Sequence, residues 1–134
     1  MAKCPCGCGR RVGFVQRRLM RHALDVDVVL PLVERLATMP PDEELPETAR
    51  AHQPSPSQLQ DFYRSGVRLR DKMMACAHGM SASSSQVPSR TELRDWRWFA
   101  NACVRVLNER DARFVRDYMQ RQRPEDRRLI ATMV

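Results

Sequence analysis

Three cysteines alternate with small residues at the start of this 134-residue chain, in the order Cys4-Pro5-Cys6-Gly7-Cys8-Gly9. Thiolates that share one zinc ion lie about 3.8 Å apart, whereas side chains two residues apart in an extended strand are separated by roughly 6.6 Å. The backbone must therefore curl, and glycines permit this because they adopt positive φ at little steric cost. Cysteines this close in sequence form only a strained disulfide. The spacing accordingly predicts a small metal site, most simply for zinc.

A tetrahedral site needs a fourth ligand, and we expect it to be the histidine nearest to the cysteines in sequence. Loop closure costs more entropy for the more distant candidates, which are Cys76, His78 and Cys103. The predicted ligands are therefore Cys4, Cys6, Cys8 and His22. Two alternatives stay open: an iron–sulfur cluster, which generally requires four thiolates, and a flexible tail whose reduced thiols bind no metal.

The same segment also carries a resemblance. The cysteine motif is followed by Arg10-Arg11-Val12 and by a basic stretch that ends in His22. In this it resembles the Cys-x-Cys-Gly-Cys-Gly zinc knuckles that head small proteins of actinobacteria and their phages. The resemblance covers about the first 22 residues of the chain. It implies zinc binding and implies no particular activity.

The second half of the chain carries clear helix signals. Ser55-Pro56-Ser57-Gln58 provides an N-cap serine, a proline at the first helical position and a capping-box glutamine. The helix that starts there should continue to about His78 and stop at Gly79, a residue type common just after helix ends. Its apolar stripe consists of Leu59, Phe62, Tyr63, Gly66, Leu69, Met73 and Ala77.

A second capping box, Ser89-Arg90-Thr91-Glu92, follows a serine-rich loop at 81–89. It predicts a long helix from about Arg90 to Gln122, broken near Asn108, and Pro124 should then start a short terminal helix. The stripe of the long helix consists of Trp96, Phe99, Cys103, Leu107, Phe114 and Tyr118. Trp98 falls off this stripe, so we expect it to be exposed.

Helix signals are weaker in the first half. We expect a short helix from Arg17 to Ala23 and a second from about Asp27 or Pro31 to Met39, because proline suits the first turn of a helix. Pro40-Pro41 should end that helix. From there to about residue 55 the chain is rich in proline and acidic residues, which predicts a solvated linker.

Together these elements predict an all-α protein. Its architecture should be a small helical bundle with two long antiparallel helices, formed by the two capped segments, plus an N-terminal zinc knuckle. The Pro31 helix should cover the seam between the long pair. We therefore divide the chain into a zinc knuckle at 1–23 and a helical bundle at 24–134, which contains the acidic, Pro-rich linker at about 40–55. Cys76 and Cys103 should be buried, unreactive thiols of the bundle.

The chain is basic, with a net charge of +7 and a sequence pI near 9.8, and arginine supplies almost all of the positive charge. Residues 1–22 contain no acidic side chain, whereas residues 23–63 are acidic overall. In the last long helix, arginines recur every eleven residues, which is about three helical turns. The candidate residues for binding phosphates or a partner are Arg10, Arg11, Arg17, Arg18, Arg21, Arg94, Arg105 and Arg116. A solvated face with local ion pairs is the simpler interpretation of each row.

Catalysis has little support in the sequence. The glycines do not form a phosphate-binding loop, the HExxH and zinc deaminase motifs are absent, and four protein ligands leave a zinc ion no position for substrate. We therefore expect no enzyme activity and no small-molecule substrate. The longest apolar stretch, Val28–Val33, is too short to span a bilayer, and an odd number of cysteines suits a reducing compartment. These features predict a cytoplasmic protein that does not enter a membrane.

Two kinds of binding protein fit these expectations. The first is a non-enzymatic, zinc-binding adaptor or regulatory protein that docks a larger protein assembly. The alternative is a zinc-knuckle accessory protein that binds nucleic acid through arginine contacts to phosphates, with an affinity that falls steeply as salt rises. The basic rows are interrupted and no motif for reading bases accompanies them, which favours the adaptor.

Overall fold

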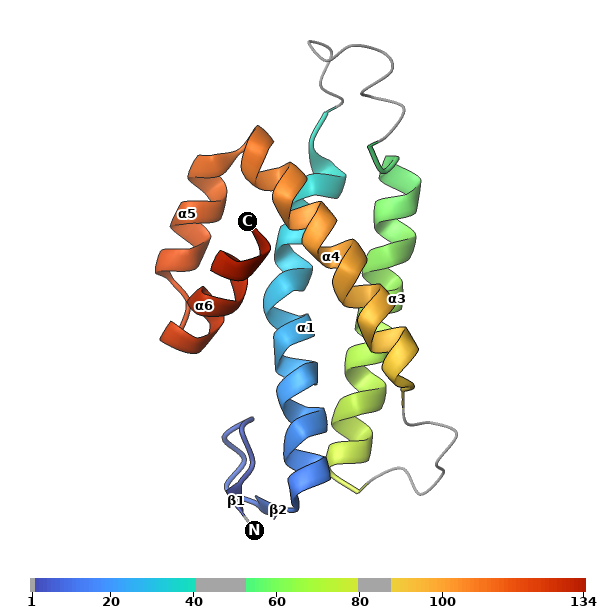
Figure 1. Cartoon of the computed structure of the whole chain (residues 1–134), viewed down its shortest axis with the longest axis vertical. Helices are drawn as coiled ribbons and strands as arrows, with labels where there is room; N and C mark the ends of the chain where they lie inside the picture. Colours follow the sequence, from blue (N-terminus) through green and yellow to red (C-terminus); the bar gives the residue numbers. More distant parts are fainter. Residues whose placement is uncertain (1, 41–52, 80–87) are drawn as a thin grey trace.

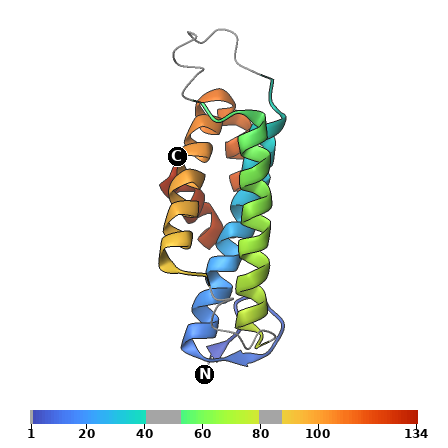
Figure 2. The ribbon, with the colours of Figure 1, turned by 90° about the vertical axis from the view of Figure 1, so that its right-hand side faces the viewer.

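Two long antiparallel helices organise the fold, as the sequence predicts. The computed structural model describes residues 2–40, 53–79 and 88–134. The elements in chain order are β1 (Ala2–Lys3), β2 (Arg11–Val12), α1 (Phe14–Thr38), α3 (Pro56–Ala77), α4 (Arg90–Arg110), α5 (Ala112–Gln120) and α6 (Pro124–Met133). Helices α1 and α3 run side by side in opposite directions, and α4 crosses one face of this pair (Figures 1 and 2). The protein is thus an all-α bundle with a minimal hairpin at its N-terminus.

The first helix differs from the prediction. We expected two separate helices with a domain boundary after residue 23, but α1 runs unbroken from Phe14 to Thr38 and that boundary falls inside it. Pro31 lies inside the helix, and its ring is exposed. Because proline has no N–H, the preceding turn lacks one hydrogen bond. The Tyr118 hydroxyl of α5 donates to the Val28 carbonyl in that turn at 2.6 Å. This bond ties α5 to the turn of α1 that precedes Pro31, whereas the carbonyl that lacks a helical N–H partner is that of Asp27.

The capping signals of the second half are confirmed. The Ser55 hydroxyl accepts from the Gln58 N–H at 3.1 Å, and the Gln58 side chain accepts from the Ser55 N–H at 2.9 Å, which completes the capping box. Ser89 caps α4 by accepting from the Glu92 N–H, without the reciprocal bond from the Glu92 side chain that would complete the predicted second capping box. The predicted break in the last long helix comes at Asp111, three residues beyond the expected position.

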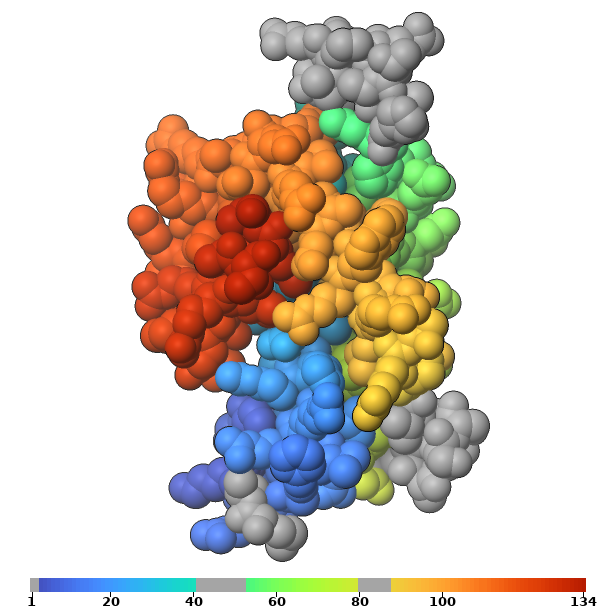
Figure 3. Space-filling view, viewed as in Figure 1, coloured from blue at the N-terminus to red at the C-terminus, as the bar shows by residue number. Residues whose placement is uncertain are grey.

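Asp111 marks a sharp turn because it ends α4 and begins α5. Its carboxylate accepts from the Phe114 N–H at 3.2 Å and from the Arg35 guanidinium at 3.0 Å. After this turn α5 runs back alongside α6, and these two helices with α4 cover part of α1 (Figures 1 and 3). Helices α5 and α6 therefore form a helical hairpin that packs on α4 and α1.

The partner in the long antiparallel pair also differs from the expectation. We predicted that α3 would pair with α4, but α1 takes that place because it is one continuous helix with a long apolar face. Helices α3 and α4 meet through aromatic rings, with centroids 5.2 Å apart for Phe62 and Trp96 and 4.5 Å apart for Phe62 and Phe99. Gly66 permits this approach, since a Cβ there would lie 2.9 Å from the Trp96 Nε1 atom.

Several expectations about burial are confirmed. The apolar stripes of α3 and α4 lie in the core, Cys76 and Cys103 are buried, and Trp98 is 72% exposed. The acidic linker at about 40–55 and the loop at 81–89 fall mostly outside the described residues. None of the described helices has the length and apolar character that crossing a membrane requires.

Candidate metal centre

A tight hairpin brings the three cysteines together. Strands β1 and β2 pair antiparallel with Lys3 opposite Arg11, and the Cys4 N–H donates to the Arg10 carbonyl at 2.8 Å. Between these points the chain turns back at Gly7 and Gly9, whose φ angles are 85° and 82°. A Cβ at either glycine would meet nothing within 4 Å, so the positions need glycine for its backbone conformation and not for space. The predicted curl of this segment is confirmed.

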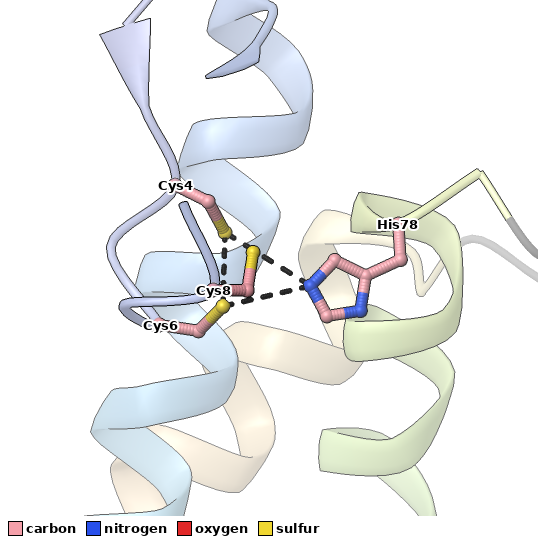
Figure 4. A group of neighbouring side chains, drawn as sticks. All are labelled: Cys4, Cys6, Cys8 and His78. Carbon is pink, nitrogen blue, oxygen red and sulfur yellow. Dashed lines mark hydrogen bonds between the residues drawn. The ribbon is translucent and has the colours of Figure 1, made fainter. Parts of the chain in front are cut away.

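His78, just after the C-terminal end of α3, completes the cluster at the same end of the bundle as the hairpin. It follows the last residue of α3, where Gly79 adopts a φ of 70° and the Gly79 N–H donates to the Cys76 carbonyl at 3.1 Å. The His78 Nε2 atom lies 3.6 Å from the Cys6 sulfur and 4.0 Å from the Cys4 sulfur (Figure 4). One ligand atom from each of Cys4, Cys6, Cys8 and His78 lies within 4.8 Å of the others.

These distances suit a single bound ion. Tetrahedral zinc places two sulfurs about 3.8 Å apart and a sulfur and an imidazole nitrogen about 3.5 Å apart. The Cys4 and Cys6 sulfurs are 3.3 Å apart, much farther than in a disulfide, and the three cysteines of the hairpin form no disulfide. Cys4 is 5% exposed, whereas Cys6 and Cys8 are open to solvent. The four side chains are therefore close enough to hold a metal ion near the surface.

The cysteines influence one another's protonation. Hydrogen bonding to Cys4, and then to Cys8, raises the pKa of the Cys6 thiol to about 11. Cys8 shows the opposite effect. A hydrogen bond from the Arg10 backbone N–H stabilises the Cys8 thiolate and lowers the pKa of Cys8. Metal binding requires thiolates, so the affinity of such a cluster must fall as the pH falls.

His22 does not join this cluster, which corrects our expectation for the fourth ligand. It lies half-buried on α1, where burial lowers its pKa, and it lines a cavity with Arg18 and Asp25. The prediction from sequence distance was wrong because the packing of α3 against α1 brings His78 next to the cysteines. The useful signal was the similar length of α1 and α3, which have 25 and 22 residues. In an antiparallel pair of similar length, the end of the second helix lies beside the start of the first.

The predicted arginines divide between surfaces. Arg21 is half-buried and the others are exposed, namely Arg10, Arg11, Arg17, Arg18, Arg94, Arg105 and Arg116. The row with an eleven-residue period does not exist, because the turn at Asp111 places Arg116 on α5 and the other two members on α4. The structure instead brings Arg18 of α1 and Arg94 of α4 to one cavity. A neighbouring hollow contains Arg17, Arg18 and Arg21.

Among the described residues, the other cysteines do not join the metal cluster. Burial alone raises the pKa of Cys103 to about 12, which keeps it a neutral thiol in the core.

Comparison with protein-family models, curated proteins and solved structures finds no significant match to this chain. Its function is therefore inferred from its own residues.

Proposed function

We propose that this protein is a non-enzymatic, zinc-binding adaptor that docks a larger protein assembly. The observation that carries the proposal is the convergence of three cysteines and His78 on one point. Three thiolates and an imidazole form a donor set that favours zinc over harder ions, and four protein ligands fill its tetrahedral shell. A closed shell leaves no position for water or substrate, which supports a structural role for the ion.

The zinc ion would fix one end of the bundle. It would link the hairpin to the end of α3 and hold the start of α1 between them. Phe14 and Val15, the first two residues of α1, are 81% and 68% exposed. Exposed apolar side chains on a rigid support suit protein docking, because little conformational entropy is lost when they bind. We propose a cytoplasmic location, where thiolate ligands stay reduced.

A second candidate function is binding to nucleic acid. One surface hollow beside Phe14 gathers five basic side chains from the hairpin, α1 and the segment before α6, namely Lys3, Arg17, Arg18, Arg21 and Arg123. Such a cluster favours contact with phosphates, and an exposed Phe ring can stack on a base. This binding mode would weaken strongly with salt, which separates it from docking through apolar contacts.

Elemental analysis tests the metal centre. We expect about one zinc ion per chain in protein purified under reducing conditions, and loss of that zinc in the His78→Ala variant. His22→Ala is the matched control, a histidine on the neighbouring helix that should retain zinc. Retention by His78→Ala with loss by His22→Ala would contradict the ligand assignment. A coloured protein that contains iron would point to an iron–sulfur cluster instead.

Affinity capture from the native cytoplasm tests the adaptor role. The tagged protein should retain one partner protein in stoichiometric amount after nuclease treatment and in moderate salt. Loss of all bound material after nuclease would favour the nucleic-acid alternative. The Cys6→Ser variant serves as a control for dependence on the metal centre, because it removes one ligand that lies on the surface.

A further inference from the structure

A groove with an apolar floor lies between α1, α4 and α6, away from the metal centre. Its volume is about 400 Å³. The floor is formed by buried Val26, Trp96 and Met133 and by half-buried Leu93 and Leu129. The three helices meet on the face shown in Figure 3, where the blue, yellow-orange and dark red surfaces adjoin. Leu93 of α4 and Leu129 of α6 thus remain partly open to solvent beside the buried side chains of the floor.

The rim of this groove is strongly basic. Four exposed arginines line it: Arg18, Arg90, Arg94 and Arg97. Among the described residues that line the groove, Asp25 is the single carboxylate and His22 is the single histidine. Arg94 has a neighbouring carboxylate, Asp95, at 3.6 Å, but both side chains are largely exposed and such a pair is easily exchanged. The rim therefore offers several guanidinium groups to an anionic partner.

We infer that this groove binds an acidic amphipathic helix of a partner protein. The inference rests on the proposed adaptor function and specifies the chemistry of the partner. An amphipathic helix inserts apolar side chains from one face into a groove, and glutamates or aspartates at the edges of that face would meet the arginines. Guanidinium groups bind carboxylates in a two-pronged geometry that favours this match.

A protein segment fits this groove better than nucleic acid does. Trp96 is the only aromatic residue among the described side chains that line the groove, and it is 9% exposed, so its ring gives no platform on which bases stack. Nucleic acid would also leave the aliphatic floor without an apolar partner. The hollow beside Phe14, with its five basic side chains, is the better phosphate surface. The two surfaces therefore predict different ligands.

Binding of synthetic peptides to the full, zinc-loaded chain tests the inference. The probes are a panel of helical peptides with leucines at i, i+3, i+4 and i+7 and glutamates on the flanking positions. We expect amide chemical-shift changes confined to α1, α4 and α6, and a shift of Trp96 emission in a Trp98→Phe background that removes the exposed indole. Peptides with lysine in place of glutamate should not bind. Absence of binding by every acidic peptide at about 1 mM would overturn the inference.

Charge reversal at the rim provides the matched comparison. Arg94→Glu with Arg97→Glu should weaken peptide binding by about tenfold or more, because it replaces two favourable charges by two repulsive ones. Arg105→Glu with Arg116→Glu makes the same change in net charge at exposed positions that do not line the groove, and should have an effect within about twofold. Equal weakening by both double variants would overturn the specific site. Tighter binding of a labelled single-stranded oligonucleotide to the same residues would overturn the choice of a protein partner.

The adaptor function and the groove can fail separately. If the partner captured from the cytoplasm stays bound to the Arg94→Glu, Arg97→Glu variant, the adaptor stands and the groove is not its docking site. If acidic peptides bind the groove but the captured material disappears with nuclease, the groove stands as a peptide site and the adaptor role fails.

Discussion

The N-terminal hairpin and the helical bundle are held together by different forces. In the hairpin segment before α1, Cys4 and Val12 are the buried residues among those whose burial is described. Helix α1 alone buries eight, namely Met20, Ala23, Val26, Val29, Leu30, Leu32, Val33 and Leu36. Apolar burial can therefore stabilise the bundle but supplies little for the hairpin. A short segment with so small a core needs another source of order, and metal ligation would provide it.

His78 connects the two regions. It belongs to the bundle, yet its imidazole lies 3.6 Å from a sulfur of the hairpin. An ion held by both would act as a cross-link that closes a loop of about 70 residues. With such a cross-link, the stability of the bundle should depend on the metal.

Removal of the metal should have the largest effect. By analogy with a disulfide, a cross-link over about 70 residues contributes roughly 4 kcal/mol to the free energy of unfolding. We expect chelation to lower the melting temperature strongly while most of the helical circular dichroism remains at low temperature, because the apolar core stays intact. Amide exchange should accelerate mainly in residues 2–13.

His78→Ala and His22→Ala sharpen this prediction. The first variant should melt at the temperature of chelated wild-type protein and respond little to chelator. The second variant should melt at a lower temperature with chelator than without it, as the wild type does. If chelation leaves the melting temperature unchanged, the hairpin and bundle are independent and the cross-link does not exist.

Truncation in the core should have the next largest effect. Leu107 of α4 is 0% exposed, and Leu107→Ala should lower the free energy of unfolding by about 3 kcal/mol because it removes apolar contacts and leaves a cavity. Zinc content should stay unchanged, which separates this effect from the metal centre. Val15→Ala, at a position that is 68% exposed, is the control and should change stability by less than about 0.5 kcal/mol in urea unfolding. Comparable losses in both variants would contradict the assigned core.

Local signals made the helical half predictable. Ser55, Gln58 and Ser89 bond to backbone groups within three residues of themselves, so their roles could be predicted without knowledge of the fold. The curl at Gly7 and Gly9 has the same local origin.

Long-range packing decided what the sequence could not. Pro31 suits a helix start in isolation, but it lies inside α1, whose apolar face packs along α3. The choice of His78 over His22 likewise follows from the pairing of α1 with α3. The break at Asp111 similarly moved Arg116 away from its expected row. Each case depends on contacts between elements that local patterns do not record.

Gly66→Ala should have a smaller effect within the bundle. Alanine favours a helix over glycine by about 0.5–1 kcal/mol, but its Cβ would lie 2.8 Å from the Leu30 Cδ2 atom and 2.9 Å from the Trp96 Nε1 atom. Both neighbours are buried, so the clash should cost more than alanine gains, with a net loss of about 1 kcal/mol in thermal unfolding. The Gly66→Ala, Leu30→Val double variant should recover part of it. A stabilised single variant would show that α1, α3 and α4 pack less closely than described.

The smallest effect should come from the ion pair that joins α1 to the turn between α4 and α5. The hydrogen bond from Arg35, followed by that from the Phe114 N–H, lowers the pKa of Asp111 below its usual 3.8. A lowered carboxyl pKa stabilises the folded state above pH 3.8 and loses that contribution as the pH falls through the folded value. Asp111→Asn keeps a good N-cap but removes the charge, so the wild type should be slightly more stable at pH 7, and the two proteins should converge as the pH falls through the folded pKa of Asp111. Both lose zinc in acid, so the difference between their melting temperatures isolates the pair. A difference that persists unchanged below that pKa would show that hydrogen-bond geometry, and not charge, holds this turn against the bundle.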